Sequence, residues 1–133
     1  MRFNKISLKD KPIFDKYLGL ERHELSVYAF GNIYIWKALF DIQWTIINGC
    51  LCIFFMDNAG SFLYIPPLSA GKEPETINKV FDILNEFNKN KDMSRIENIE
   101  KKDTLFYGNL GYAYKNKSYD YLCRRTGLSN LSG

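Results

Sequence analysis

A short loop ahead of the best predicted helix carries the residues most suited to binding an anion. Residues 67–75 read PLSAGKEPE and lie between a predicted strand and that helix. Backbone N–H groups at the start of a helix bind phosphate groups. The candidates to contact such a group are Ser69, Gly71 and Lys72. Pro74 removes one N–H donor, and Glu73 and Glu75 repel phosphate. A plain connection between strand and helix is therefore the favoured interpretation.

A general base requires a positioned His, Glu or Tyr. His23 is the single histidine and lies in a polar stretch between two predicted helices, so we expect it at the surface. Tyr64 and Asp57 lie on or beside predicted central strands and could face a cleft, but packing is the favoured role for Tyr64. The sequence supports no Ser-His-Asp or Cys-His arrangement. No catalytic residue is therefore assigned.

The cysteines indicate neither a disulfide nor a metal site. Cys50, Cys52 and Cys123 make an odd count in a chain without an export signal, which favours free thiols. Cys50 and Cys52 are two residues apart on a predicted strand and share a face, which is not the Cys-x-x-Cys spacing. With one histidine there is no four-ligand zinc set. We expect buried, inert thiols and no metal.

The length and composition of the sequence predict one globular domain spanning residues 1–133. The sequence is 46% hydrophobic and 25% charged, with a formal charge of +3, which permits an anionic partner without requiring one. No N-terminal signal is visible, and the longest apolar run, residues 50–56, is too short to span a bilayer. We therefore expect a cytoplasmic protein without a membrane span.

Three strands in the middle of the chain should form an antiparallel meander. Residues 43–47 are β-branched and aromatic, and Asn48-Gly49 follows as a strong hairpin signal. Residues 50–56 are continuously apolar, as in a central strand covered on both faces. Residues 61–65 supply the third strand.

Helices and further strands surround this meander. The helix after Pro74 has an apolar stripe at helical spacing, formed by Ile77, Val80, Phe81, Leu84 and Phe87. Asp10 and Ser26 are candidate N-caps of two earlier helices. The remaining elements are a first strand at 3–8, a strand at 94–99, a short helix at 102–110, and strand-like segments at 112–114 and 119–123 separated by a polar turn at 115–118. The pattern predicts an α+β fold with a mixed, mostly antiparallel sheet flanked by helices.

Several segments together resemble a known bacterial family. They are residues 3–6 (FNKI), the predicted helix 26–36 with its FGNIYIW at 30–36, the loop 65–68 (IPPL), and the end from 119–122 (YDYL) through 128–133 (LSNLSG). In order and spacing they are similar to bacterial proteins related to the C-terminal catalytic region of phosphatidylglycerol lysyltransferase. The resemblance implies two tandem domains of the GNAT (acyl-CoA N-acyltransferase) type, whose members transfer acyl or aminoacyl groups. It places the chemistry mainly in the second domain or between the two.

The resemblance covers only the first domain of such a pair, because family members continue through a basic segment beyond the point matched by residue 133. It therefore implies a GNAT-like half-domain, non-catalytic alone, that acts in domain pairing or docking. Its partner is a second GNAT-like domain or another copy of itself, as a homodimer. An acetyl-CoA site would use the loop at 67–75, but the usual pattern of Gln or Arg followed by spaced glycines is absent there.

Two alternatives stay open. One is a stand-alone acyltransferase that uses acyl-CoA or aminoacyl-tRNA. The other is an RNA-binding module with tRNA as a partner, because the second half of the chain interleaves basic and aromatic residues. These are Lys89, Lys91, Lys101, Lys102, Lys115, Lys117, Arg124 and Arg125, with Tyr107, Tyr112, Tyr114, Tyr119 and Tyr121. Acidic residues intervene, so a solvated surface over a tyrosine-rich core is the favoured interpretation.

Overall fold

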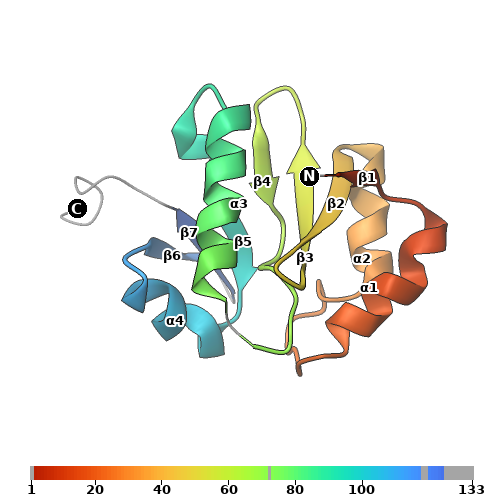
Figure 1. Cartoon of the computed structure of the whole chain (residues 1–133), viewed down its shortest axis with the longest axis horizontal. Coiled ribbons are helices and arrows are strands. Elements are labelled where there is room, and N and C mark those ends of the chain that lie inside the picture. Colours follow the sequence, from red (N-terminus) through yellow and green to blue (C-terminus); the bar gives the residue numbers. More distant parts are fainter. Residues whose placement is uncertain (1, 72, 118–119, 125–133) are drawn as a thin grey trace.

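The chain forms an α+β fold around one mixed β-sheet (Figure 1). The computed structural model describes residues 2–71, 73–117 and 120–124, with side chains through Tyr112. Within these residues seven strands are ordered β1-β2-β3-β4-β5-β7-β6. They are β1 (Asn4–Lys5), β2 (Asp41–Ile47), β3 (Cys50–Met56), β4 (Ser61–Leu63), β5 (Ile96–Ile99), β6 (Ala113–Lys117) and β7 (Asp120–Arg124). Only β4 and β5 pair in parallel among the described strands.

Helices lie on both faces of this sheet. They are α1 (Lys11–Leu18), α2 (Phe30–Tyr34) with the 3-10 turn η2 (Ile35–Ala38), α3 (Pro74–Phe87), and α4 (Thr104–Asn109) after the 3-10 turn η4 (Lys101–Asp103). Figure 1 shows α3 in front of the sheet and α1 and α2 at its right-hand end. Each side has its own apolar core, one under α3 and one under α1 and α2.

The β2–β3 hairpin confirms the strongest turn prediction. Asn48 and Gly49 have φ values of 52° and 77°, the left-handed conformation that a type I′ turn requires at both positions. The register pairs Ile47 with Cys50. Strand β3 is buried on both faces, as expected. The side chains on the same face as Cys52 pack under α3, and those on the same face as Phe55 pack under α1 and α2.

Strands β4 and β5, joined by α3, meet at one parallel pair, Leu63 and Ile96. Beyond it a side chain, not the backbone, bridges the two strands. Asn98 has a φ of 55° and its Nδ2 donates to the Tyr64 carbonyl at 2.7 Å. The Tyr28 hydroxyl donates to the Asn98 carbonyl at 2.6 Å. Asn98 is therefore bonded on one side to the residue after β4 and on the other to Tyr28.

Several boundaries differ from the sequence prediction. Ser26 does not cap the second helix, which begins at Phe30, because Ser26 lies in a turn closed by the bond from the Tyr28 N–H to the Leu25 carbonyl at 3.2 Å. Asp10 makes no side-chain cap of α1; its carboxylate accepts from the Ser7 N–H at 2.8 Å and from the indole of Trp44 at 2.9 Å. The first strand spans two residues, and β6 continues to Lys117, through most of the predicted polar turn.

Candidate functional site

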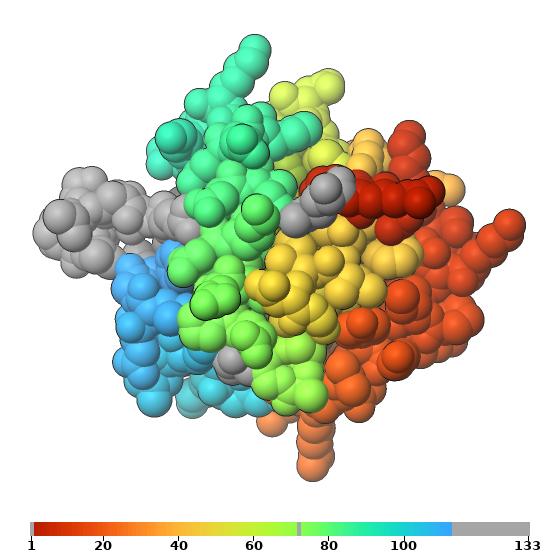
Figure 2. Space-filling model, viewed as in Figure 1, coloured from red at the N-terminus to blue at the C-terminus, as the bar shows by residue number. Residues whose placement is uncertain are grey.

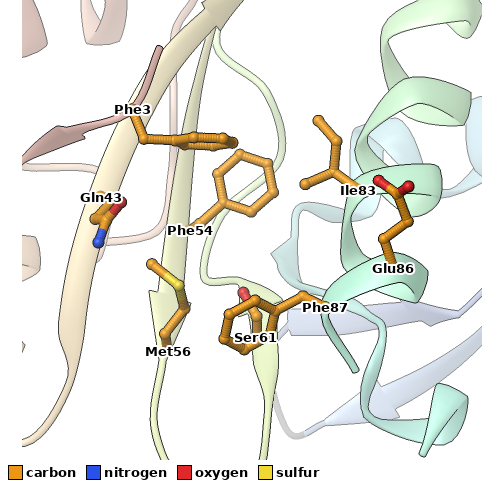
Figure 3. Close-up of a pocket in the computed structure, with 8 residues that line it drawn as sticks. All are labelled: Phe3, Gln43, Phe54, Met56, Ser61, Ile83, Glu86 and Phe87. Carbon is orange, nitrogen blue, oxygen red and sulfur yellow. The ribbon is translucent and has the colours of Figure 1, made fainter. Parts of the chain in front are cut away.

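An open apolar groove of about 460 Å³ lies between α3 and the sheet (Figure 3). Its apolar lining comes from three parts of the chain: Phe3 before β1, Phe54 and Met56 on β3, and Ile83 and Phe87 on α3. Figure 2 shows this face, where the gold surface of the β2–β3 hairpin lies beside the green α3 and below the dark red N-terminal segment.

The groove has projecting aromatic sides and a buried aromatic floor. Phe3 is 37% exposed and Phe87 is 54% exposed, whereas Phe54 between them is 2% exposed. The rings of Phe3 and Phe54 meet edge to face with centroids 5.4 Å apart. Gln43, Ser61 and Glu86 complete the lining, and Glu86 is its one charged residue among those described. Sequence reasoning placed Phe87 on the packed stripe of its helix and so missed this surface.

The loop at 67–75 lies between β4 and α3, where the sequence placed it. The Ser69 hydroxyl donates to the Gly71 carbonyl, so two of the candidate anion ligands contact each other, while Lys72 lies outside the described residues. The Thr76 N–H donates to the Glu73 carbonyl at 3.1 Å and is directed into the helix. The cavity beside this loop holds about 20 Å³, the space of a single water.

His23 is not at the surface, which corrects the sequence prediction. Its side chain is 10% exposed, and its Nδ1 lies 2.7 Å from Oε1 of Glu100, whose side chain is 4% exposed. The other oxygen of Glu100 accepts the N–H groups of Glu24 at 2.5 Å and Leu25 at 3.2 Å. Because Glu100 lies far along the sequence, no local pattern indicated this contact.

Folding lowers the pKa of Glu100. Burial is the largest single effect and acts in the opposite direction, but the hydrogen bonds from His23, Glu24 and Leu25 together outweigh it. The ionised carboxylate accepts, so Nδ1 of His23 carries a proton. The ring of Tyr28 stacks on His23 with centroids 4.1 Å apart. Burial, followed by the charge of Glu100, raises the pKa of the Tyr28 hydroxyl. With Nδ1 bonded in this way, His23 holds the loop at residues 23–25 against the end of β5.

The two other candidate bases have structural roles. Tyr64 stacks on Phe55 with centroids 4.5 Å apart, which confirms the packing role. Asp57 is exposed, and its Oδ1 accepts the N–H groups of Ala59 at 2.9 Å and Gly60 at 3.2 Å, so it stabilises the β3–β4 turn.

Cys50 and Cys52 are free and buried as predicted, at 1% and 0% exposure. Burial, followed by the neighbouring Cys50, raises the pKa of the Cys52 thiol, which keeps it protonated. The side chain of Cys123 is not among those described. Over the described part of the chain, no group of His, Cys, Asp and Glu residues could hold a metal ion. Within the same residues, no helix has the length and apolarity to cross a bilayer.

Of the tyrosines proposed to interleave with basic residues, some have described side chains and the others lie beyond Tyr112. Tyr107 and Tyr112 are 2% and 6% exposed and belong to the core under α3, as the solvated-surface interpretation expected. Lys101 and Lys102 are exposed. The side chains of residues 113–125 lie outside those described, so the basic and aromatic residues there stay a prediction.

Comparisons with known proteins relate the chain to one solved structure. Neither a protein-family model nor a curated protein matches the sequence. The fold is similar to that of a conserved protein of unknown function from Bacteroides thetaiotaomicron, with a TM-score of 0.75 and 13% sequence identity. The match covers 88% of this chain and 39% of that one. The chain thus shares its fold with a region that makes up less than half of a longer protein.

Proposed function

We propose that this chain is a GNAT-like half-domain that works by pairing with a second domain of the same kind, and that it does not transfer acyl groups alone. The observation that carries the proposal is the open groove between α3 and the sheet. The exposed apolar side chains gathered around this groove offer a surface that a partner can cover. Phe3 and Phe87, both large and apolar, project on either side of it.

Two further findings support the pairing role. The matched region occupies 39% of the Bacteroides thetaiotaomicron protein, so this fold occurs there within a longer chain. In addition, a GNAT-like pyrophosphate site would use the loop between β4 and α3, and the cavity beside this loop holds only about 20 Å³, which disfavours a cofactor there. The α+β sheet, antiparallel except at β4–β5, agrees with a GNAT-like fold.

A second copy of the chain is the partner to which we commit. A twofold interface places the same surface on both subunits, so that surface must carry both a projection and a hollow. The groove has both: the exposed ring of Phe87 lies at one edge, where it extends from α3 toward Met56, and Phe54 and Met56 form an apolar floor (Figure 3). Phe87 of each copy would enter the groove of the other, and such a dimer would imitate a tandem pair of domains.

Sedimentation equilibrium over a range of protein concentrations tests the proposal. We expect a reversible dimer for the wild type and a monomer for Phe87→Ser, which removes the projecting ring from an exposed position and leaves the fold intact. Leu105→Ser is the matched control: it removes an apolar side chain that is 72% exposed and lies on α4, and it should leave the dimer unchanged. A wild-type chain that stays monomeric up to about 1 mM would refute self-pairing.

A further inference from the structure

A second cavity, of about 290 Å³, lies on the opposite face of the sheet from the groove. We call it the aromatic pocket. Its walls are Trp36 and Phe40 from the η2 region, Phe62 and Tyr64 from β4 and the residue after it, and Arg95 and Glu97 from β5 and the residue before it. Asn98 completes the lining. Phe62 belongs to the core under α1 and α2, whereas Phe54 of the groove belongs to the core under α3.

The parallel pairing of β4 and β5 sets an aromatic row beside a polar row. Phe62 and Tyr64 are two residues apart and share one face, as do Arg95 and Glu97. Because Leu63 pairs with Ile96, the two rows lie next to each other. One side of the pocket is therefore aromatic and the other side carries hydrogen-bonding groups.

The aromatic side is held in place by contacts among the rings. The Trp36 indole N–H donates to the Tyr64 hydroxyl at 3.1 Å, and the two ring centroids are 6.3 Å apart. Tyr64 stacks on Phe55 behind it, and Phe40 meets Phe62 edge to face at 5.6 Å. Trp36, Phe40 and Tyr64 are only half-buried, so this ordered aromatic surface is open to a ligand.

The polar side is an ion pair lying on an aromatic ring. Nε of Arg95 donates to Oε2 of Glu97 at 2.6 Å and Nη1 donates to the Met93 carbonyl at 3.0 Å. The guanidinium carbon is 4.1 Å from the ring centre of Phe62. The side chains of Arg95 and Glu97 are 16% and 11% exposed, so both are largely removed from water. Arginine has five N–H groups in a fixed plane, so this anchored side chain has donors beyond its two bonds within the protein.

These features select the chemistry of the ligand. Arg95 offers a planar set of N–H donors and Glu97 offers a carboxylate, so the polar side suits a ligand edge that carries both acceptors and donors. A flat ring with such an edge fits both sides. Unpaired bases are bound in this way, stacked on aromatic rings or guanidinium planes and hydrogen-bonded at their edges.

We propose that the aromatic pocket binds a purine base, stacked against Trp36 and hydrogen-bonded at its edge by Arg95 and Glu97. The cavity of about 290 Å³ suits one base with its sugar, at the lower limit of ordinary ligand pockets. The base can belong to a free nucleotide or to an unpaired position in RNA. This site is independent of pairing through the groove, since it lies on the other face of the sheet.

The indole N–H signals of the two tryptophans give a direct test by nuclear magnetic resonance with adenosine. Trp36 lines the pocket, whereas Trp44 donates to Asp10 at 2.9 Å elsewhere and serves as an internal control. We expect adenosine to shift the Trp36 signal saturably and to leave the Trp44 signal in place. No shift of Trp36 with adenosine up to about 10 mM, or with single-stranded oligoadenylate, would overturn the proposal. So would a response to phenylalanine without one to adenosine.

Two substitutions make the test specific, with binding measured by calorimetry. Trp36→Leu removes a stacking ring, and Arg95→Lys keeps the charge but loses the planar set of donors. Each should weaken adenosine binding at least about fivefold. Phe87→Ser, on the other face, should leave it unchanged. If Trp36→Leu does not fold, Arg95→Lys and the wild-type Trp36 signal still decide the question.

The source of the base follows from a comparison of ligands. Adenosine monophosphate that binds as tightly as oligoadenylate indicates a free nucleotide. Much tighter binding of the oligonucleotide, weakening with salt, indicates an unpaired base of RNA. Adenosine binding that is unaffected by both Trp36→Leu and Arg95→Lys would place the ligand elsewhere and reject the pocket.

Discussion

Glu100 at the end of β5 is hydrogen-bonded to His23, 77 residues earlier in the chain, with Nδ1 and Oε1 2.7 Å apart. The same carboxylate accepts the N–H groups of Glu24 and Leu25. One buried side chain thus fixes a loop that has no regular structure of its own to the end of β5. The loop leads into Tyr28, whose hydroxyl reaches Asn98. A chain of contacts therefore joins the first helices to β5.

Replacing Glu100 with Gln should destabilise the protein, and the loss should depend on pH. At neutral pH the variant should lose roughly 1.5–3 kcal/mol, since hydrogen bonds to a buried ionised group are lost. Folding lowers the pKa of Glu100 below its ordinary 4.5. The stabilisation is therefore complete above about pH 4.5 and is lost as the pH falls through the folded-state pKa. Urea unfolding of both proteins across this range measures the difference.

Lys102→Gln is the matched control for Glu100. Its Nζ lies 4.0 Å from Oε1 of Glu100, but its side chain is 41% exposed. Removing this solvated charge should cost under about 1 kcal/mol. Equal losses for the two variants, or a Glu100→Gln loss that does not change between neutral and acidic pH, would contradict the assignment of the stabilisation to the buried carboxylate.

Asn88→Ala should be among the most damaging single substitutions. The side chain of Asn88 accepts from the Ser61 N–H at 2.6 Å and donates to the Ser61 carbonyl at 2.9 Å and to the Ser94 hydroxyl at 2.8 Å. Without it these buried groups lose their partners, at a cost of roughly 2–4 kcal/mol. Asn90→Ala removes only an exposed cap of the Asp92 N–H and should cost about 1 kcal/mol. Thermal unfolding of the two variants distinguishes them.

Two substitutions at Asn98 separate backbone strain from hydrogen bonding. Gly accepts the φ of 55° freely, so Asn98→Gly loses the bond from Nδ2 to the Tyr64 carbonyl, about 1–3 kcal/mol, together with the smaller entropy cost of ordering a glycine. Asn98→Ala loses the same bond and adds the strain of a left-handed residue, about 1 kcal/mol more. Urea unfolding should therefore rank wild type above Gly and Gly above Ala. An Ala variant as stable as the Gly variant would show that this backbone conformation is not strained.

The sequence predicted the elements whose patterns are local. The predictions of the Asn48-Gly49 turn and of β3 were correct. A type I′ turn requires residues that accept positive φ, and a strand buried on both faces requires apolar residues throughout. Helix α3 was found from its stripe, although Phe87 at its end is exposed. Phe87 lies in the last turn of α3, beyond the core, and the spacing of apolar residues does not show where the core ends.

The candidate sites depended on contacts between distant segments, and there the sequence was a weaker guide. His23 was expected at the surface because its neighbours in the sequence are polar. In the structure His23 contacts the buried carboxylate of Glu100, which also accepts the N–H of Glu24. The aromatic pocket combines η2, β4 and β5, which the chain order separates by a hairpin and a helix. Trp36, Tyr64 and Arg95 become one surface only through the parallel pairing of β4 with β5.

Acetyl-CoA should not bind to the isolated chain. At the start of α3, Pro74 has no N–H, and the N–H of Thr76 already donates to the Glu73 carbonyl. The carboxylates of Glu73 and Glu75 are exposed beside the loop and repel a pyrophosphate. Calorimetry with millimolar acetyl-CoA should therefore give no saturable heat. Saturable binding that strengthens in a Glu73→Gln, Glu75→Gln double variant would locate a cofactor at this loop and would favour a stand-alone acyltransferase over a pairing domain.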